Sequence, residues 1–134
     1  MTVQKVVNVE KDIQTKIAKK LLDMIILQLL NTQPMHGYEL ISTIRRTFSV
    51  YFGPSTVYPL LATLEKKDYI TSHWDMENDR PRKVYSLTAD GNDALIFSES
   101  ALNAICQKMA PFLITTGDAL NSATPDVTSE PSTP

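Results

Sequence analysis

Two short stretches of the sequence carry groups suited to binding phosphate. The stretch GPSTVYP (residues 53–59) opens a helical pattern, and Pro54 suits the first helical position, where its missing N–H costs nothing. The small residues beside it let backbone N–H groups approach an anion at the positive end of the helix. The stretch RPRK (residues 80–83) places three cations around a proline that stiffens its loop. Both stretches favour contact with a polyanion.

Catalytic and metal chemistry have little support. The chain has one cysteine, Cys106, and two histidines, His36 and His73, so we expect no internal disulfide and no site with several thiolate ligands. The sequence offers no pairing of a nucleophile with a base, no phosphate loop and no metal cluster. We therefore predict a protein that is not an enzyme and has no cofactor. Both histidines are predicted to be structural, and Cys106 to be a buried apolar residue.

The net charge of −2 does not favour nucleic acid, but the charge is unevenly spread. The segment from Arg45 to Lys83 contains seven basic and five acidic residues. Residues 118–134 contain three acidic residues and no basic one. Electrostatic footprints are local, so DNA binding stays open. No apolar run approaches the ~18–20 residues needed to span a bilayer, and the first twelve residues have no apolar signal segment. We expect a cytoplasmic protein without a membrane partner.

Hydrophobic periodicity divides the chain into helices and one hairpin. Residues 1–11 are predicted to be a flexible arm. Helices are predicted from about Asp12 to Leu30, Gly37 to Thr47 and Pro54 to Lys67, with a short strand at Ser49 to Phe52. The β-branched and aromatic runs Tyr69 to Asp75 and Lys83 to Thr88 predict a hairpin with a long polar tip. Thr88 then caps a last helix that reaches residue 116 and is ended or kinked at Pro111, and the Ser/Thr/Pro-rich residues 117–134 are predicted to be a disordered tail.

This order of elements predicts a mainly α fold with a small β-hairpin: a winged helix-turn-helix over residues 12–88 and a C-terminal dimerisation helix over residues 89–116. The third helix would lie in the major groove of DNA, with Tyr58 on its exposed front. In the last helix, apolar residues recur at steps of three and four. This spacing produces a narrow apolar stripe, here called the seam, along which two helices can pack. The seam has no obvious partner within the chain, so we assign it to dimerisation through Leu95, Leu102, Ile105 and Met109.

The sequence resembles the PadR family of transcriptional regulators. The resemblance rests on LLDMIILQLLNTQPMHGYELISTI (residues 21–44), GPSTVYPLLATLEKKDYI (residues 53–70) and RPRKVYSLTADG (residues 80–91), and it covers residues 20–112. It implies a dimeric winged-helix DNA-binding repressor of the short type with a single C-terminal helix. Asp68 stands where a glycine usually ends the recognition helix, so the helix end is expected to differ locally.

The resemblance also implies roles for particular residues. Ser55, Thr56 and Tyr58 would face DNA from the recognition helix. Arg80, Arg82 and Lys83 would place the wing, which is the predicted hairpin, against the backbone or the minor groove. Tyr38 would brace the helix-turn-helix and is a further candidate for contact with a DNA phosphate. The plainer alternatives are that Tyr58 is half-buried against the wing and that the wing cations are a solvated tip. Trp74 is expected to pack within the wing rather than to hold a ligand.

The leading function is a sequence-specific transcriptional regulator, a repressor that binds double-stranded DNA as a homodimer on a pseudo-palindromic operator. The alternative is a winged-helix protein-interaction module without DNA binding, which the overall acidity favours. The wing cations and the small residues at the helix start argue against that alternative. Members of the family respond to phenolic or other hydrophobic molecules, so a small hydrophobic effector stays open.

Overall fold

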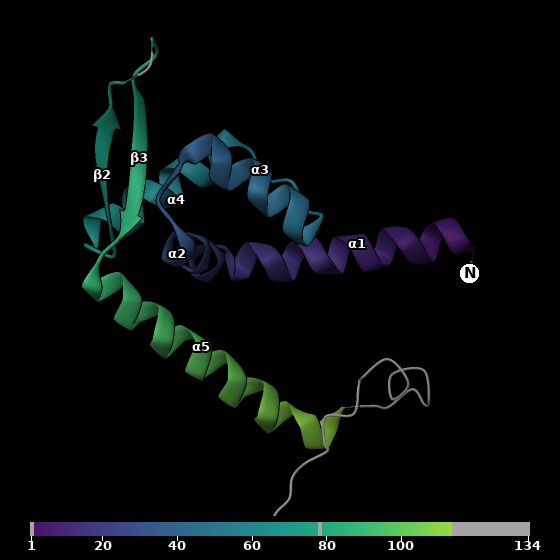
Figure 1. Cartoon of the computed structure of the whole chain (residues 1–134). Helices are drawn as coiled ribbons and strands as arrows, with labels where there is room; N and C mark the ends of the chain where they lie inside the picture. The colour runs from purple at the N-terminus through teal and green to yellow at the C-terminus, as the bar shows by residue number, and fades with distance from the viewer. Residues whose placement is uncertain (1, 78, 114–134) are drawn as a thin grey trace, which may run out of the picture. The chain divides into compact units, whose positions relative to one another are not determined.

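The computed structural model describes residues 2–77 and 79–113 (Figure 1). The first compact unit spans residues 1–100, and the second begins at Ala101, within the last helix. The described residues are mainly helical with one small antiparallel sheet, which confirms the predicted fold class. In chain order the elements are α1 (Val3–Lys20), α2 (Leu22–Thr32), β1 (Met35–His36), α3 (Gly37–Phe48), α4 (Pro54–Lys66), β2 (Ile70–Asp75), β3 (Arg82–Leu87), α5 (Ala89–Met109) and the 3-10 turn Ala110–Phe112.

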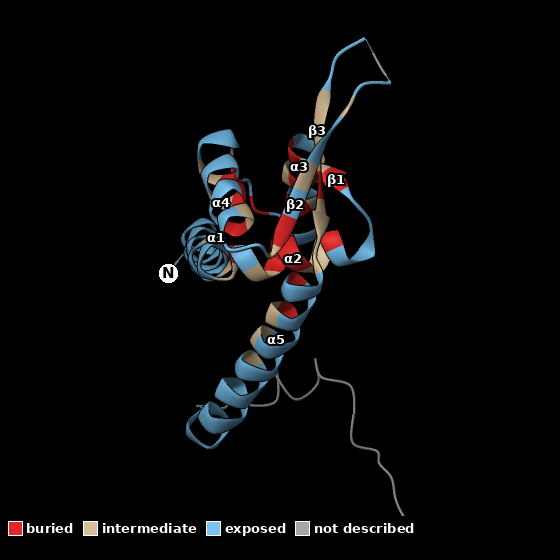
Figure 2. Ribbon diagram, turned by 90° about the vertical axis from the view of Figure 1, so that its left-hand side faces the viewer, coloured by how far each residue is buried: buried red, intermediate tan, exposed pale blue. Residues whose placement is uncertain are grey.

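The core of the first unit gathers around α2. This helix is apolar on nearly every side, and a helix of that kind must be covered on several sides. Figure 2 shows buried residues on the facing sides of α2, α3 and α4 and at the start of α5. The most deeply buried large side chains come from α2, α3, α4 and the first residue of β2: Leu22, Ile26, Leu40, Ile44, Val57, Leu61 and Ile70.

The sheet has three strands in the order β1-β3-β2, both pairs antiparallel. The hairpin is confirmed, with Ile70 opposite Leu87 and Asp75 opposite Arg82. The strand predicted at Ser49 to Phe52 is wrong: Ser49 caps α3 in the left-handed conformation with φ 58°, and a loop follows it. The third strand is the two-residue β1, which pairs with β3 through Met35 and Tyr85. Two residues are too few to show a period of two, so β1 leaves no local signal in the sequence.

The N-terminal helix differs from the prediction. Residues 3–11, predicted to belong to a flexible arm, form the first turns of α1. The Thr2 side chain caps this helix by accepting a hydrogen bond from the Lys5 N–H at 3.2 Å. The predicted single helix from Asp12 to Leu30 is two helices separated at Leu21, whose φ of −100° and ψ of 10° lie outside the helical region. Several β-branched residues lower the helix propensity of the first turns, which explains the wrong assignment. The division of the chain into functional domains stays a prediction.

The recognition-helix candidate α4 ends in a Schellman motif. Asp68 has φ 64°, its N–H bonds the Glu65 carbonyl at 3.0 Å, and the Tyr69 N–H bonds the Leu64 carbonyl at 3.0 Å. Asp68 thus adopts the left-handed conformation that a glycine would supply, and the expected local difference at the helix end is not seen. The side chain has been accommodated at some conformational cost.

The last helix begins as predicted and ends two residues before Pro111, short of the predicted end at residue 116. The Thr88 hydroxyl accepts the Gly91 N–H at 2.9 Å and donates to the Asp68 carbonyl at 2.6 Å, so it caps α5 and ties it to the end of α4. Helix α5 ends at Met109, and Pro111 lies in the following 3-10 turn. The predicted disordered tail and residues 114–116 of the predicted helix lie outside the described residues.

Two residues of α5 differ from their predicted roles. Leu95 is only 3% exposed and belongs to the core of the first unit, so it already has a partner within the chain. Cys106 is exposed rather than buried. In the second unit, Leu102 is half-buried, whereas Ile105 and Met109 are 54% and 50% exposed.

Candidate nucleic-acid interface

The start of α4 presents small polar residues to solvent. Gly53 is the N-cap and Pro54 the first helical residue, and the Gly53 carbonyl accepts the N–H groups of Thr56 and Val57 at 3.0 Å each. The Val57 side chain is fully buried and anchors the first turn in the core. Ser55 is exposed and Thr56 half-buried, beside the positive end of the helix dipole.

Tyr58 lies over a glycine of the neighbouring helix. Its side chain is 42% exposed, so it is neither free nor buried. A Cβ atom added to Gly37 would lie 2.5 Å from Tyr58 Cε1 and 2.6 Å from its hydroxyl oxygen. The Tyr58 ring therefore rests on the bare backbone at the start of α3. Whether the ring also packs against the wing stays a prediction.

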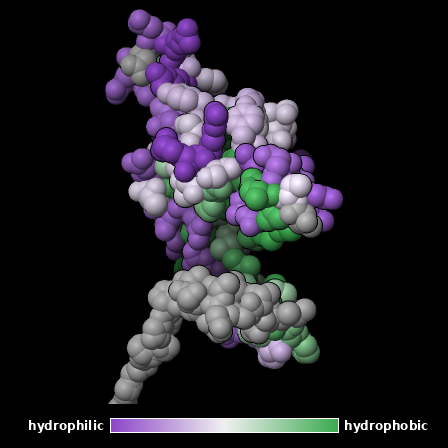
Figure 3. All heavy atoms as spheres, turned by 90° about the vertical axis from the view of Figure 1, so that its right-hand side faces the viewer, coloured by the Kyte–Doolittle hydropathy of each residue, from purple (hydrophilic) through white to green (hydrophobic). Residues whose placement is uncertain are grey.

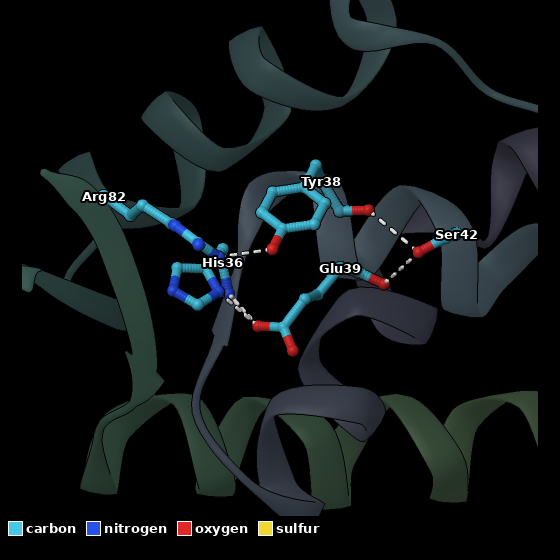
Figure 4. A network of polar contacts seen from close by, with 5 residues as sticks. All are labelled: His36, Tyr38, Glu39, Ser42 and Arg82. Atoms are coloured by element: carbon cyan, nitrogen blue, oxygen red, sulfur yellow. Dashed lines mark hydrogen bonds and ion pairs between the residues drawn. The ribbon is translucent and has the colours of Figure 1, made fainter. Parts of the chain in front are cut away.

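A polar network joins α3 to the wing (Figure 4). The Arg82 guanidinium on β3 donates to the Tyr38 hydroxyl, and its Cζ lies 5.5 Å from the Tyr38 ring centroid. The His36 ring stacks on Tyr38 with a centroid distance of 5.5 Å and an interplanar angle of 18°. The Glu39 carboxylate accepts the His36 backbone N–H at 2.9 Å and also contacts His36 Nδ1. The His36 side chain in turn accepts the Glu39 backbone N–H, so the two residues form a capping box at the start of α3.

These contacts stabilise the charged form of Glu39. The hydrogen bond from the His36 backbone N–H is the main reason that the pKa of Glu39 is lowered, and partial burial opposes it. The His36 side chain and the positive charge of Arg82 lower this pKa further. The carboxylate is thus the form that fits the capping box.

The three wing cations do not form one cluster. Arg82 and Lys83 are neighbours on β3, so their side chains leave opposite faces of the sheet. Lys83 Nζ lies 4.0 Å from a carboxylate oxygen of Glu65, a residue whose carboxylate also accepts the Ser72 hydroxyl at 2.6 Å. Arg80 precedes β3 and is exposed, on a tip whose surface is hydrophilic (Figure 3). An open hollow of about 410 Å³ is lined by Tyr38, Arg80, Pro81 and Arg82.

Comparison with known proteins identifies the family. A family model described as the transcriptional regulator PadR-like family matches residues 26–96, more than half of the chain. The chain belongs to the PadR-like family of transcriptional regulators. This membership confirms the resemblance predicted from the sequence. No curated protein sequence matches the chain.

Solved structures of transcriptional regulators share the fold. A PadR family transcriptional regulator of Eggerthella lenta is 24% identical, with a TM-score of 0.73 over 85% of this chain and all of that one. A transcriptional regulator of Clostridium thermocellum is 26% identical, with a TM-score of 0.68 over 74% of this chain and 99% of that one. A PadR family transcription regulator of Clostridium difficile is 27% identical, with a TM-score of 0.64 over 70% and 99%.

The PadR-like chain also carries contacts that sequence reasoning missed. The link between Arg82 and Tyr38 joins residues 44 positions apart, and the seat of Tyr58 is a glycine on another helix. The capping box could have been predicted from the sequence, because HGYE has a polar residue at the N-cap and a glutamate three residues later. Trp74, predicted to pack in the wing, is 60% exposed.

Other site types find no support within residues 2–77 and 79–113 of this PadR-like chain. No three potential ligands among His, Cys, Asp and Glu gather there in a way that would hold a metal ion. In the same ranges, every helix is too short or too polar to span a bilayer. The family is one of transcriptional regulators rather than enzymes.

Proposed function

We propose that this chain binds double-stranded DNA in a sequence-specific manner in the cytoplasm, as a homodimer that represses transcription. Family membership supports a regulator of transcription. The observation that carries the proposal is the start of α4, where Ser55 and Tyr58 reach solvent while Val57 between them is fully buried. A helix held this way can enter a groove without disturbing the core.

The geometry suggests a division of labour between helix and wing. Ser55, Thr56 and Tyr58 would contact base edges or thymine methyl groups from α4. Arg80 is exposed at the wing tip, and Arg82 lines the same hollow, so both suit phosphate or a narrow minor groove. Lys83 is partly compensated by Glu65, and we expect its contact to be weaker. Tyr38 braces the wing through Arg82.

The homodimer is supported by apolar side chains that the single chain leaves exposed. Helix α1 exposes Val7, Ile13 and Ile17 by 50% or more. In the second unit, an open hollow of about 430 Å³ is lined by Ile105, Lys108, Met109, Phe112 and Leu113. Because isolated apolar patches of this kind mark contact surfaces, a second copy would cover them. The dimer would place two recognition helices about one DNA turn apart, ~34 Å.

A small hydrophobic effector is also part of the proposal. Within the first unit, α2, α4 and α5 surround a hollow of about 330 Å³. Its lining is mixed: Met24, Leu27, Leu64 and Phe97 are apolar, whereas Asp23, Lys67 and Ser98 are polar. A volume near ~300 Å³ is at the lower end for ligand pockets, so it suits a single-ring compound.

The test is the affinity for operator and random duplex at several salt concentrations. Arg80→Ala should weaken both duplexes alike and reduce the salt slope by ~0.9 for each phosphate that is no longer neutralised, or ~2 for a symmetric dimer. Tyr58→Ala should weaken binding by ~1–3 kcal/mol, mainly on the operator. Lys66→Ala removes an exposed cation at the far end of α4 and is the matched control. A result in which Lys66→Ala acts as strongly as Arg80→Ala contradicts the assignment of the wing.

The alternative is a protein-interaction module. Trp74 and Met76 on the wing are 60% and 67% exposed, and exposed aromatic and methionine side chains suit a protein contact. If the wild-type chain binds no duplex at any salt concentration, this function replaces DNA binding.

A further inference from the structure

Residues 36–39, at the start of α3, touch both of the parts proposed to face DNA. Gly37 lies under the Tyr58 ring of α4, and Tyr38 accepts the hydrogen bond from Arg82 of the wing. The two contacts come from adjacent residues and run to elements that are separate in the chain. One short segment therefore sets where each of these side chains lies.

We propose that Gly37 and Tyr38 are positioning residues for DNA recognition: Gly37 seats Tyr58, and Tyr38 holds Arg82 and with it the wing. This inference rests on the proposed function. Neither residue needs to touch a base for this role. For Tyr38 this role goes beyond bracing the helix-turn-helix, because it also fixes the position of Arg82.

The role of Gly37 follows from the lack of room for a side chain beneath Tyr58. It is buried at the first position of α3, and an added Cβ would fall within 2.6 Å of three Tyr58 side-chain atoms. Those atoms are the far end of a side chain, so Gly37→Ala can be accommodated when Tyr58 turns away. The expected result is a folded protein with a displaced Tyr58, because alanine itself favours a helix over glycine.

The role of Tyr38 follows from where the strand pairing stops. The β1–β3 ladder ends at His36 opposite Val84, and the Tyr38–Arg82 contact continues the link two residues further along β3. Beyond that ladder, Tyr38 gives Arg82 a partner on the side away from β2. The wing near Arg82 is thus tied to α3 as well as to its own hairpin.

The Tyr38 ring is itself fixed by its neighbours. His36 stacks on it, and His36 Nδ1 faces the Glu39 carboxylate. His36 Nε2 is buried with no hydrogen-bond partner among the described residues, so the Nδ1 side of the ring makes its polar contacts. Ser42 donates to the Tyr38 carbonyl at 3.1 Å and so holds the backbone of the same turn.

The first experiment is a double-mutant cycle of Gly37→Ala with Tyr58→Ala, measured as the ratio of operator to random-duplex affinity. Gly37→Ala alone should reduce that ratio by about five- to 100-fold, the range expected when one base is no longer read. In the Tyr58→Ala background it should change the ratio less than about twofold, since the residue through which it acts is gone. Equal effects in both backgrounds overturn the role of Gly37.

The second cycle pairs Tyr38→Phe with Arg82→Ala. Tyr38→Phe removes one hydroxyl and keeps the ring, and it should weaken both duplexes about three- to tenfold, as loss of one solvent-exposed hydrogen bond would. The effect should vanish in the Arg82→Ala background. Tyr69→Phe, at the far end of the hairpin, is the matched control and should change nothing. A Tyr38→Phe effect that persists without Arg82 overturns the role of Tyr38.

A readout without DNA separates this inference from the proposed function. In the free protein, Gly37→Ala should shift the Tyr58 ring resonances, and Tyr38→Phe should shift the Arg82 Nε–H resonance, while the melting temperature changes little. If these resonances do not move, the positioning contacts are absent in solution and the inference fails, whatever the DNA affinity. If they move but the wild-type chain binds no duplex, the proposed function fails, and a role in DNA recognition fails with it.

Discussion

Gly91 and Gly37 both lack room for a side chain, but for different reasons. A Cβ on Gly91 would lie 1.9 Å from the Tyr69 carbonyl oxygen and 2.7 Å from Leu87 Cδ1. A Cβ on Gly37 would meet only the end of the Tyr58 side chain. Backbone cannot turn aside as a ring can, so the two positions should respond differently to the same substitution.

We predict that Gly91→Ala lowers the free energy of unfolding by ~1–3 kcal/mol or more, because α5 must move away from the end of the hairpin. Urea denaturation of the wild type and the variant measures this change in the free energy of unfolding. Gly37→Ala is the control and should change the urea midpoint little. Equal losses in both variants would mean that the close approach of α5 to Tyr69 does not set the stability.

Asp68 carries a conformational penalty that glycine would avoid. In the left-handed region an L-residue costs roughly 1–2 kcal/mol, less for aspartate. Asp68→Gly should therefore raise the free energy of unfolding by ~0.5–1 kcal/mol. Lys67→Gly is the matched control: Lys67 has φ −82° in the helical region, so glycine there should destabilise. A thermal melt of both variants checks the sign.

The lowered pKa of Glu39 predicts a dependence of stability on pH. Its folded-state pKa lies below the ordinary value of 4.5, so the carboxylate stabilises the fold above that value. The contribution is lost as pH falls through the folded-state pKa. Glu39→Gln keeps a capping side chain without the charge. Its deficit relative to wild type should be present at pH 7 and shrink below pH 4.5; a deficit independent of pH would assign the effect to shape rather than charge.

At the scale of elements, the sequence predicted the helices whose first residues carry a clear start signal. Pro54 marks the start of α4 and Thr88 that of α5, and both helices begin within a residue of the expected place. Val50 and Phe52 alternate with the exposed Tyr51, which imitates a strand, although their burial comes from a loop that crosses the core. Local patterns cannot separate those two causes of alternation.

The candidate site was predictable in its residue types but not in its contacts. Ser55 and Tyr58 are exposed on α4, as their place in the helical pattern indicates. The pairings of Arg82 with Tyr38 and of Lys83 with Glu65 depend on which distant segments meet, and the β1 strand that brings α3 beside β3 was not foreseen. The sequence shows directly which residues are charged, whereas the partner of each charge depends on the tertiary fold.

At the scale of the whole molecule, the dimer remains the central prediction. Removing residues from Asp90 onward would also delete the buried Leu95, so point substitutions are a cleaner test. The double variant Ile105→Glu, Met109→Glu should sediment as a monomer, since it places charge on an apolar surface that a partner would cover. Met76→Glu is the control, because Met76 is 67% exposed on the wing. If the double variant stays a dimer, α5 is not the interface.

Helix α1 has a further consequence for how the chain folds. It is 18 residues long, none of them buried, and only Ala18 packs against the core. A helix of this length with little tertiary support is marginal in water. We expect far-UV circular dichroism to lose helical signal on dilution of the protein, in step with dissociation. Helix formation in α1 and self-association would then be a single concentration-dependent equilibrium, and the amount of protein in the cell would set how much of α1 is helical.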